Sequence, residues 1–159
     1  MLSRVEKFEA ALAQTDCDAG LVTNLKNIYY LTGFSGTEAT VFISKKRRIF
    51  LTDARYTLIA KGVVQGFDIV ETRDAIGEIV KIIADDKLQK IGFDDEISYA
   101  YFKMLESVFS DYELVPMTGF IENLRMIKDE QEIATIRKAC QISDQAFLDV
   151  LDFIKPGET

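Results

Sequence analysis

The sequence predicts an α/β fold: a three-layer domain with a mixed, mainly parallel sheet flanked by helices, followed by a long C-terminal linker helix. Short apolar runs, bounded by turn or charged residues, alternate with segments whose apolar residues recur at helical spacing. A short basic turn joins two of the apolar runs, and so short a connection can link only antiparallel strands. At 159 residues the chain is long enough for one domain with a real core and an appendage.

The predicted helices begin near the N-terminus. Residues 3–13 place apolar side chains on one face, and Ser3 and Glu6 have the spacing of a capping box. Helical spacing recurs over 55–63, 75–84 and 98–109.

Six apolar runs are the predicted strands, at residues 19–23, 39–44, 49–52, 67–71, 90–93 and 113–115. The basic cluster at residues 45–48 lies between the second and third runs and is interpreted as a solvated hairpin turn. A nucleic-acid patch is disfavoured because the formal net charge is −7, which repels phosphate backbones.

The C-terminal segment has a pattern of its own. Asp129 and Glu132 are spaced as a cap pair, and apolar residues recur at helical spacing up to Pro156. A helix of about 25 residues would extend about 37 Å. Its apolar stripe over 133–147 fits packing on its own domain and docking on an absent partner equally well, whereas 150–154 favours the absent partner. We therefore expect two parts, 1–127 and 128–159.

Composition narrows the chemistry. There is no histidine, so a histidine general base and an imidazole-ligated metal are excluded within this chain. The two cysteines, Cys17 and Cys140, are far apart, which favours reduced thiols over a bridge or a zinc site. No apolar run approaches the roughly 20 residues of a membrane span, and the N-terminal segment lacks a signal peptide pattern. We expect a cytoplasmic protein that binds neither membrane nor nucleic acid.

The polar segment from Gly33 to Glu38 is the first candidate for function. Its two glycines permit a tight turn and are expected to expose Phe34. A phosphate-binding loop is disfavoured because a strand, not a helix, follows the glycines. Composition alone favours a plain connecting loop over a ligand-contacting one.

Carboxylates that follow predicted strands are the second candidates. Asp53 resembles a phosphoacceptor in position, but the accompanying carboxylates fall before the first strand, so capping of the next helix with local pairing to Arg55 is favoured. The acidic run 94–96 could supply an acid and a base or hold a divalent ion. Complementing the dipole of the helix that starts near Ser98 is the favoured interpretation.

Several stretches together resemble the creatinase/prolidase/aminopeptidase P family, in its N-terminal domain and the linker into its catalytic domain. Each motif is of modest specificity, but their order and spacing match the family over nearly the whole chain. The matching stretches are residues 27–36, 51–56, 91–94, 124–133, 136–139, 144–147 and 154–159, the last resembling the entry to the catalytic half.

The resemblance implies a two-domain Xaa-Pro metallopeptidase whose catalytic half binds two divalent metal ions, usually manganese, that activate a water. None of its ligands is in this chain, so no catalytic or metal residue is assigned here. It also implies a homodimer built by the N-terminal domain, whose loop approaches the partner's active site and limits the substrate to short peptides with proline in second position. Phe34, Ser35, Gly36, Thr37 and Glu38 thereby become candidate substrate-contacting residues acting in trans.

Three alternatives stay open or are weighed. The loop sequence is most similar to short bacterial Xaa-Pro aminopeptidases, with Xaa-Pro dipeptidases (prolidases) close behind. A non-enzymatic protein-binding module of the same fold fits the chain too. A free-standing receiver or nucleotide-binding domain is disfavoured because the glycine fingerprint is missing.

Overall fold

The computed structural model describes residues 3–157, so Glu158 and Thr159 of the expected entry to a following domain lie outside the described residues. The chain divides into two compact units, residues 1–124 and 125–159. The first holds the sheet and its helices, and the second holds the C-terminal helix.

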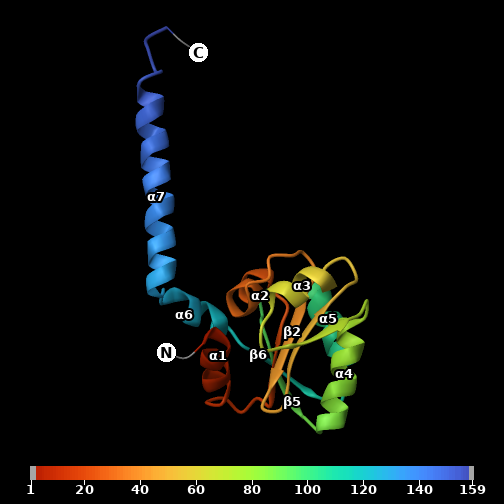
Figure 1. Cartoon of the computed structure of the whole chain (residues 1–159). Coiled ribbons are helices and arrows are strands. Elements are labelled where there is room, and N and C mark those ends of the chain that lie inside the picture. Colours follow the sequence, from red (N-terminus) through yellow and green to blue (C-terminus); the bar gives the residue numbers. More distant parts are fainter. Residues whose placement is uncertain (1–2, 158–159) are drawn as a thin grey trace. The chain divides into compact units, whose positions relative to one another are not determined.

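The six predicted strands form one sheet in the order β4-β3-β2-β1-β5-β6 (Figure 1). Strand β2 runs antiparallel to β1 and β3, and the other three neighbouring pairs are parallel. The prediction of a mixed, mainly parallel sheet is confirmed. The strands are β1 (Ala19–Val22), β2 (Thr40–Ser44), β3 (Arg48–Thr52), β4 (Asp68–Glu71), β5 (Lys90–Phe93) and β6 (Glu113–Pro116).

The helices follow the predicted spacing with two additions. The capping box of Ser3 and Glu6 opens the first helix as predicted. Two short helices, α2 and α6, were not predicted. The helices of the described residues are α1 (Arg4–Leu12), α2 (Leu25–Thr32), α3 (Thr57–Val63), α4 (Ala75–Asp86), α5 (Tyr99–Val108), α6 (Phe120–Met126) and α7 (Glu130–Leu151).

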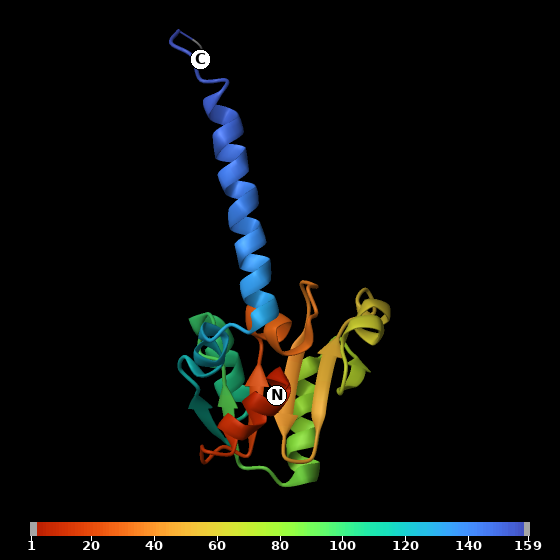
Figure 2. The ribbon, with the colours of Figure 1, turned by 60° about the vertical axis from the view of Figure 1, so that its left-hand side comes forward.

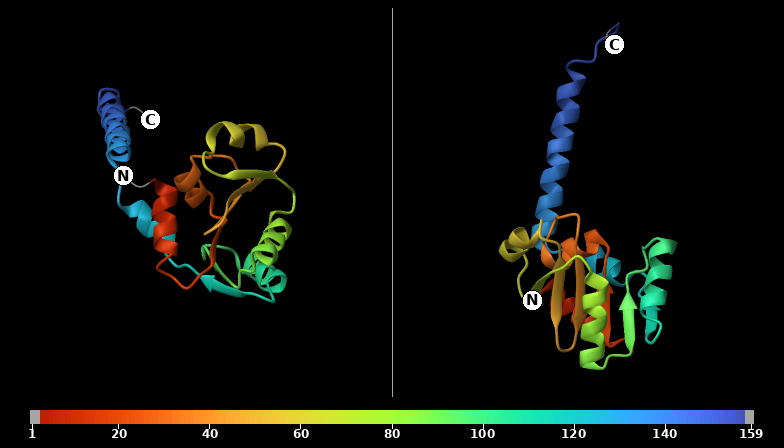
Figure 3. Two further views of the ribbon diagram at one scale, coloured as in Figure 1. Left: turned by 60° about the horizontal axis from the view of Figure 1, so that its bottom comes forward. Right: turned by 90° about the vertical axis from the view of Figure 1, so that its right-hand side faces the viewer.

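Alternation along the strands creates a core on each face of the sheet. Val41 and Phe50 join the cluster formed with α1, α2, α3 and α6, while their neighbour Phe42 joins the cluster formed with α4 and α5. Figure 3 shows α1 on one side of the sheet and α4 and α5 on the other. The three-layer architecture is therefore confirmed.

The ends of strand β2 define two opposite edges of the sheet. The predicted basic turn joins β2 to β3, whereas the segment that contains Phe34 enters β2 from α2. Figure 2 shows the hairpin turn at one end of the strands and the Phe34 segment at the other. The candidate loop thus lies at the edge where the parallel strands β1, β3, β4 and β5 end.

The second unit consists mainly of α7, a helix of 22 residues that spans about 33 Å. Asp129 and Glu132 form the predicted capping box at its start. From Ile133 to Leu151 every residue of the helix is exposed in this chain.

Two further expectations concern composition. Cys17 is buried and Cys140 exposed, and both are free thiols, as predicted. Among the described residues, no helix is long and apolar enough to cross a membrane.

Candidate functional site

The candidate loop, residues 33–38, begins where α2 ends. Asn24 caps the start of α2 by accepting a hydrogen bond from the Lys26 amide at 2.9 Å. Gly33 closes the helix in the left-handed region, with φ of 75°, and donates its amide to the Tyr29 carbonyl at 2.8 Å. A side chain at position 33 would be strained in this conformation, so glycine sets the direction in which the chain leaves α2.

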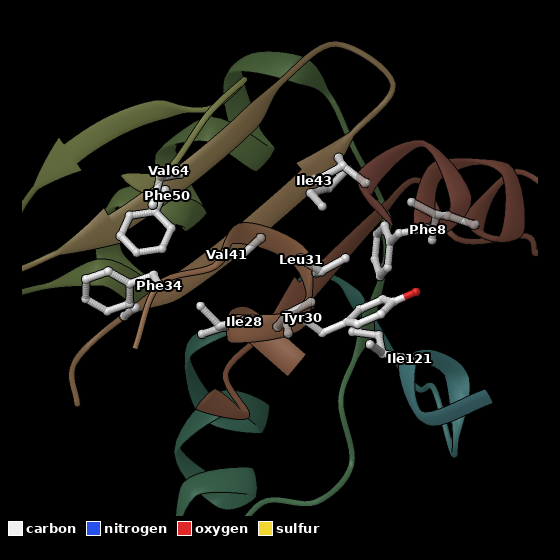
Figure 4. Close-up of a cluster of buried hydrophobic side chains, with 14 of the residues drawn as sticks. Phe8, Ile28, Tyr30, Leu31, Phe34, Val41, Ile43, Phe50, Val64 and Ile121 are labelled. Carbon is white, nitrogen blue, oxygen red and sulfur yellow. The ribbon is translucent and has the colours of Figure 1, made fainter. Parts of the chain in front are cut away.

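The expectation that Phe34 is exposed is wrong. Its side chain is 1% exposed and lies in the core cluster beside Phe50, as Figure 4 shows. The ring makes edge contacts with Phe50, at 5.0 Å between centroids, and with Tyr56, at 5.6 Å. The two flanking glycines turn the backbone so that the ring points inward, because burying an aromatic ring is worth about 1.5–3 kcal/mol. Phe34 therefore anchors the loop from below.

Gly36 is required by close packing. A Cβ atom at this position would lie 2.2 Å from Cζ of Phe34 and 2.9 Å from Cδ1 of Tyr56. Both atoms belong to packed rings, so any larger residue would push the loop off its anchor. The second glycine of the motif thus serves packing.

The outer part of the loop is polar and exposed. The side chains of Ser35, Thr37 and Glu38 are exposed, and Gly36 is half-buried. The Thr37 hydroxyl lies 2.8 Å from the Tyr56 hydroxyl, and the Thr52 hydroxyl donates to the Glu38 carbonyl at 2.6 Å. The loop therefore presents polar groups to solvent from a backbone that strand β3 and its next residues hold in place.

Glu38 separates two cavities at this edge of the sheet. One, of about 400 Å³, is lined among others by Asp53, Arg55 and Arg73 beyond the ends of β3 and β4. The other, of about 350 Å³, is lined by Asn24, Ser98 and Tyr101 among others, beyond the ends of β1 and β5. In α/β folds, ligands commonly bind beyond the carboxyl ends of strands. The edge that carries the loop is therefore also hollowed.

Asp53 makes the predicted local pair but does not cap a helix with its side chain. Its Oδ2 accepts from Nε and Nη2 of Arg55, at 2.9 and 2.6 Å, and its Oδ1 accepts from the Arg55 amide at 2.9 Å. The hydrogen bond from Arg55 lowers the pKa of Asp53. Helix α3 begins later, after Tyr56, so Asp53 stabilises the turn that precedes it.

The acidic run 94–96 connects other segments instead of facing the start of α5. Asp94 is buried and accepts from the Thr23 amide and hydroxyl, at 3.0 and 2.9 Å, and from the Asn24 amide at 2.6 Å. Glu96 accepts from the Asn24 side chain at 2.9 Å, and Ser98 alone caps α5.

The parallel register explains this correction. Phe93 of β5 lies opposite Leu21 of β1, so Asp94 meets the residues that follow β1. Burial raises the pKa of Asp94, although the hydrogen bonds that it accepts act in the opposite direction. The carboxylate fixes the β1–α2 connection and is thus structural.

Metal binding is not supported by the residues at hand. Among the described residues, no group of three or more histidine, cysteine, aspartate or glutamate side chains could hold a metal ion. The chemistry available at this edge is recognition through a polar loop with a buried anchor.

A family model described as the creatinase/prolidase N-terminal domain matches residues 4–127. The chain belongs to this family. A curated relative, an uncharacterized peptidase (YqhT) of Bacillus subtilis, is 36% identical over 97% of this chain, which spans 44% of that relative.

Two solved structures support the same assignment. A structure described as aminopeptidase P, an Xaa-Pro aminopeptidase from Streptococcus thermophilus, is 56% identical with a TM-score of 0.74, and the match covers 77% of this chain and 95% of that one. The Xaa-Pro dipeptidase from Bacillus anthracis is 35% identical with a TM-score of 0.90, over 98% of this chain and 44% of that one. The chain therefore spans less than half the length of the Bacillus proteins that it matches.

Proposed function

We propose that this chain is the non-catalytic N-terminal domain of a metal-dependent Xaa-Pro peptidase, most similar in kind to aminopeptidase P. The observation that carries the proposal is the family match over residues 4–127 together with relatives of more than twice the length that are named as peptidases. In this proposal residues 1–127 are the domain, and residues 128–159 are the linker helix and the start of the catalytic domain. A cytoplasmic location belongs to the same proposal.

The proposed metal centre lies in the catalytic domain that follows. The family resemblance implies two divalent ions, with manganese expected, and residues that this chain does not contain would hold them. When bound, such ions activate a water for attack on the peptide carbonyl. The part of the chain described here supplies no ligand to them, which supports a role in assembly and access.

The loop 33–38 is proposed to limit access to the active site of a second subunit. Its backbone is held by hydrogen bonds and packing, and its outer side chains are polar and exposed. Because Phe34 is buried, the groups proposed to face substrate directly are Ser35, Gly36, Thr37 and Glu38, with Phe34 as their support.

Homodimerisation through this domain is proposed with it. Helix α3 buries Ala60 but leaves Leu58, Ile59 and Val63 exposed, at 83%, 53% and 44%. Leu58 and Ile59 follow Tyr56, which contacts the loop, so a second copy on this face would meet the loop as well. Covering large apolar side chains is the usual driving force for such an interface.

A mixed-dimer experiment tests the trans role directly. One full-length subunit carries Thr37→Ala and Glu38→Ala, and the other carries an inactivated catalytic domain. If the loop acts in trans, the intact loop of the inactive subunit serves the active site of the loop variant. The mixture then regains the KM of the unmodified enzyme, with kcat per active site restored in the mixed dimers. A mixture that keeps the KM of the loop variant would show that the loop acts in cis or not at all.

Substrate length separates the two activities that the relatives' names suggest. The B. anthracis match favours an Xaa-Pro dipeptidase as the second candidate. Full-length enzyme that hydrolyses Xaa-Pro-Yaa tripeptides as well as dipeptides supports the aminopeptidase, and hydrolysis confined to dipeptides supports the dipeptidase. Coding sequence after Thr159 that lacks metal ligands would instead favour the protein-binding module.

A further inference from the structure

Residues 53–56, the second motif that the family resemblance uses, remain without a role in the function proposed so far. Their position along the chain is 15 or more residues from the loop. In the fold they meet it, because β3 delivers them to the edge where the loop enters β2. We propose that this motif is a positioning device for the loop 33–38, with Tyr56 as the positioning residue. This inference rests on the proposed function only in what the loop is positioned for.

Tyr56 contacts the loop at three successive points. Its hydroxyl lies 2.8 Å from the Thr37 hydroxyl, and its ring packs edge-on against Phe34 at 5.6 Å. The space between these contacts leaves no room for a Cβ at Gly36, since Cδ1 of Tyr56 would be 2.9 Å away. One half-buried side chain thus fixes an inward anchor, a close-packed backbone position and an outward polar group.

The Asp53–Arg55 pair holds Tyr56 in turn. The Asp53 carbonyl accepts from the amides of Tyr56 and Thr57, at 3.1 and 3.2 Å. The Arg55 guanidinium is held by the Asp53 carboxylate and lies 5.4 Å from the centre of the Tyr56 ring. A cation at this distance attracts an aromatic ring. The polar groups of Asp53 are therefore used within the motif itself.

The strand residue Thr52 completes the arrangement. Its hydroxyl donates to the Glu38 carbonyl at 2.6 Å, directly beside the Thr37 contact. The loop has no secondary structure of its own, yet it is tied down at its start by Gly33, in its middle by Tyr56 and at its end by Thr52. Of these ties, the Tyr56 hydroxyl is the one that acts on an exposed side chain of the loop.

Cleavage by a glutamyl endopeptidase after Glu38 tests the inference in the 159-residue chain. Cleavage requires local opening of the loop, so its rate reports the open population when the protease is dilute. Cleavage after Glu78 in α4 reports opening of the opposite helical layer and serves as the internal reference. Each rate is divided by the rate for a synthetic peptide of the same sequence, which removes the sequence preference of the protease.

Tyr56→Phe removes the hydroxyl and keeps the ring. We expect it to raise the ratio of Glu38 to Glu78 cleavage about threefold to tenfold, as loss of one hydrogen bond implies. Tyr99→Phe, at a side chain that is 77% exposed on α5, is the matched control and should leave the ratio unchanged. Arg55→Ala should raise the ratio by a smaller factor, and Arg55→Lys should restore part of it.

Thr37→Val removes the other hydroxyl and guards against a Tyr56 variant that fails to fold. Combined with Tyr56→Phe, it should add little to the single change, because both remove the same contact. An unchanged ratio in Tyr56→Phe, or equal increases at Glu38 and Glu78, would overturn the inference. Peptidase kinetics do not enter this readout, so a failure of the proposed function would leave the result standing.

Discussion

The two ends of strand β2 are held by different kinds of interaction. At its start, the loop 33–38 is held by a buried ring, two glycines and hydrogen bonds between neutral groups. At its end, the turn into β3 is held by charges: Arg47 pairs with Asp86 at 2.9 Å, and Arg48 pairs with Glu9 at 2.6 and 2.7 Å. Packing keeps a polar loop in place without using its exposed side chains, which leaves them free to contact another molecule.

The largest expected effect comes from removing the buried anchor of the loop. Phe34→Ala should lower the free energy of unfolding by about 3–5 kcal/mol, because it leaves a cavity beside Phe50 and Tyr56. Urea unfolding measures the change, and Phe153→Ala, at a side chain that is 75% exposed, is the matched control. A loss below about 1 kcal/mol would mean that the ring does not anchor the loop.

A smaller effect is expected at the adjacent β1–α2 connection. Asp94→Ala leaves the amides of Thr23 and Asn24 without their acceptor, which should cost about 1–3 kcal/mol. Asp111→Ala, at an exposed turn residue, should be neutral by the same unfolding measurement. Equal stabilities of the two variants would contradict the structural role of Asp94.

The contact between loop and motif should appear as a coupling. Thr37→Val and Tyr56→Phe should each cost about 0.5–1 kcal/mol, since the hydroxyl pair is exposed. The double variant should lose less than the sum, because each single change already removes the shared hydrogen bond. Strict additivity in a double-mutant cycle of unfolding free energies would show that the two hydroxyls do not interact.

The smallest effects are expected at the charged turn, and they should depend on salt and acid. Arg47 lowers the pKa of Asp86 below its ordinary value of 3.8. A lowered folded-state pKa contributes stability above pH 3.8 that is lost as the pH falls through the folded value. Asp86→Asn should therefore lose less stability than the unmodified chain between pH 5 and 3, and the difference should shrink in 1 M salt. An acid profile that the substitution leaves unchanged would show that the turn is not held by this pair.

Elements with a local signal could be predicted from the sequence. The capping boxes at Ser3 and Asp129 mark helix starts because their hydrogen bonds join residues three apart. Helix α2 was missed because its eight residues are too few for a clear period, although Asn24 and Gly33 are ordinary start and stop residues. Those two residues were a usable signal.

Side-chain direction in the loop could not be predicted in the same way. Whether Phe34 points in or out depends on Phe50 and Tyr56, which come from a strand and a turn later in the chain. The partners of Asp94 are likewise 70 and 71 residues away and depend on the register of β1 against β5. Such contacts follow from tertiary pairing and leave no periodic trace in the sequence.

Hydrolysis of Xaa-Pro peptides by the 159-residue chain and by the full-length product of its gene, each with added manganese, tests the central claim most directly. The account predicts metal-dependent release of the N-terminal residue by the full-length protein and none by the chain alone, which has no histidine and, among its described residues, no group suited to a metal. Metal-dependent turnover by the pure chain would contradict the account, and so would a metal-loaded full-length protein that leaves Xaa-Pro peptides intact.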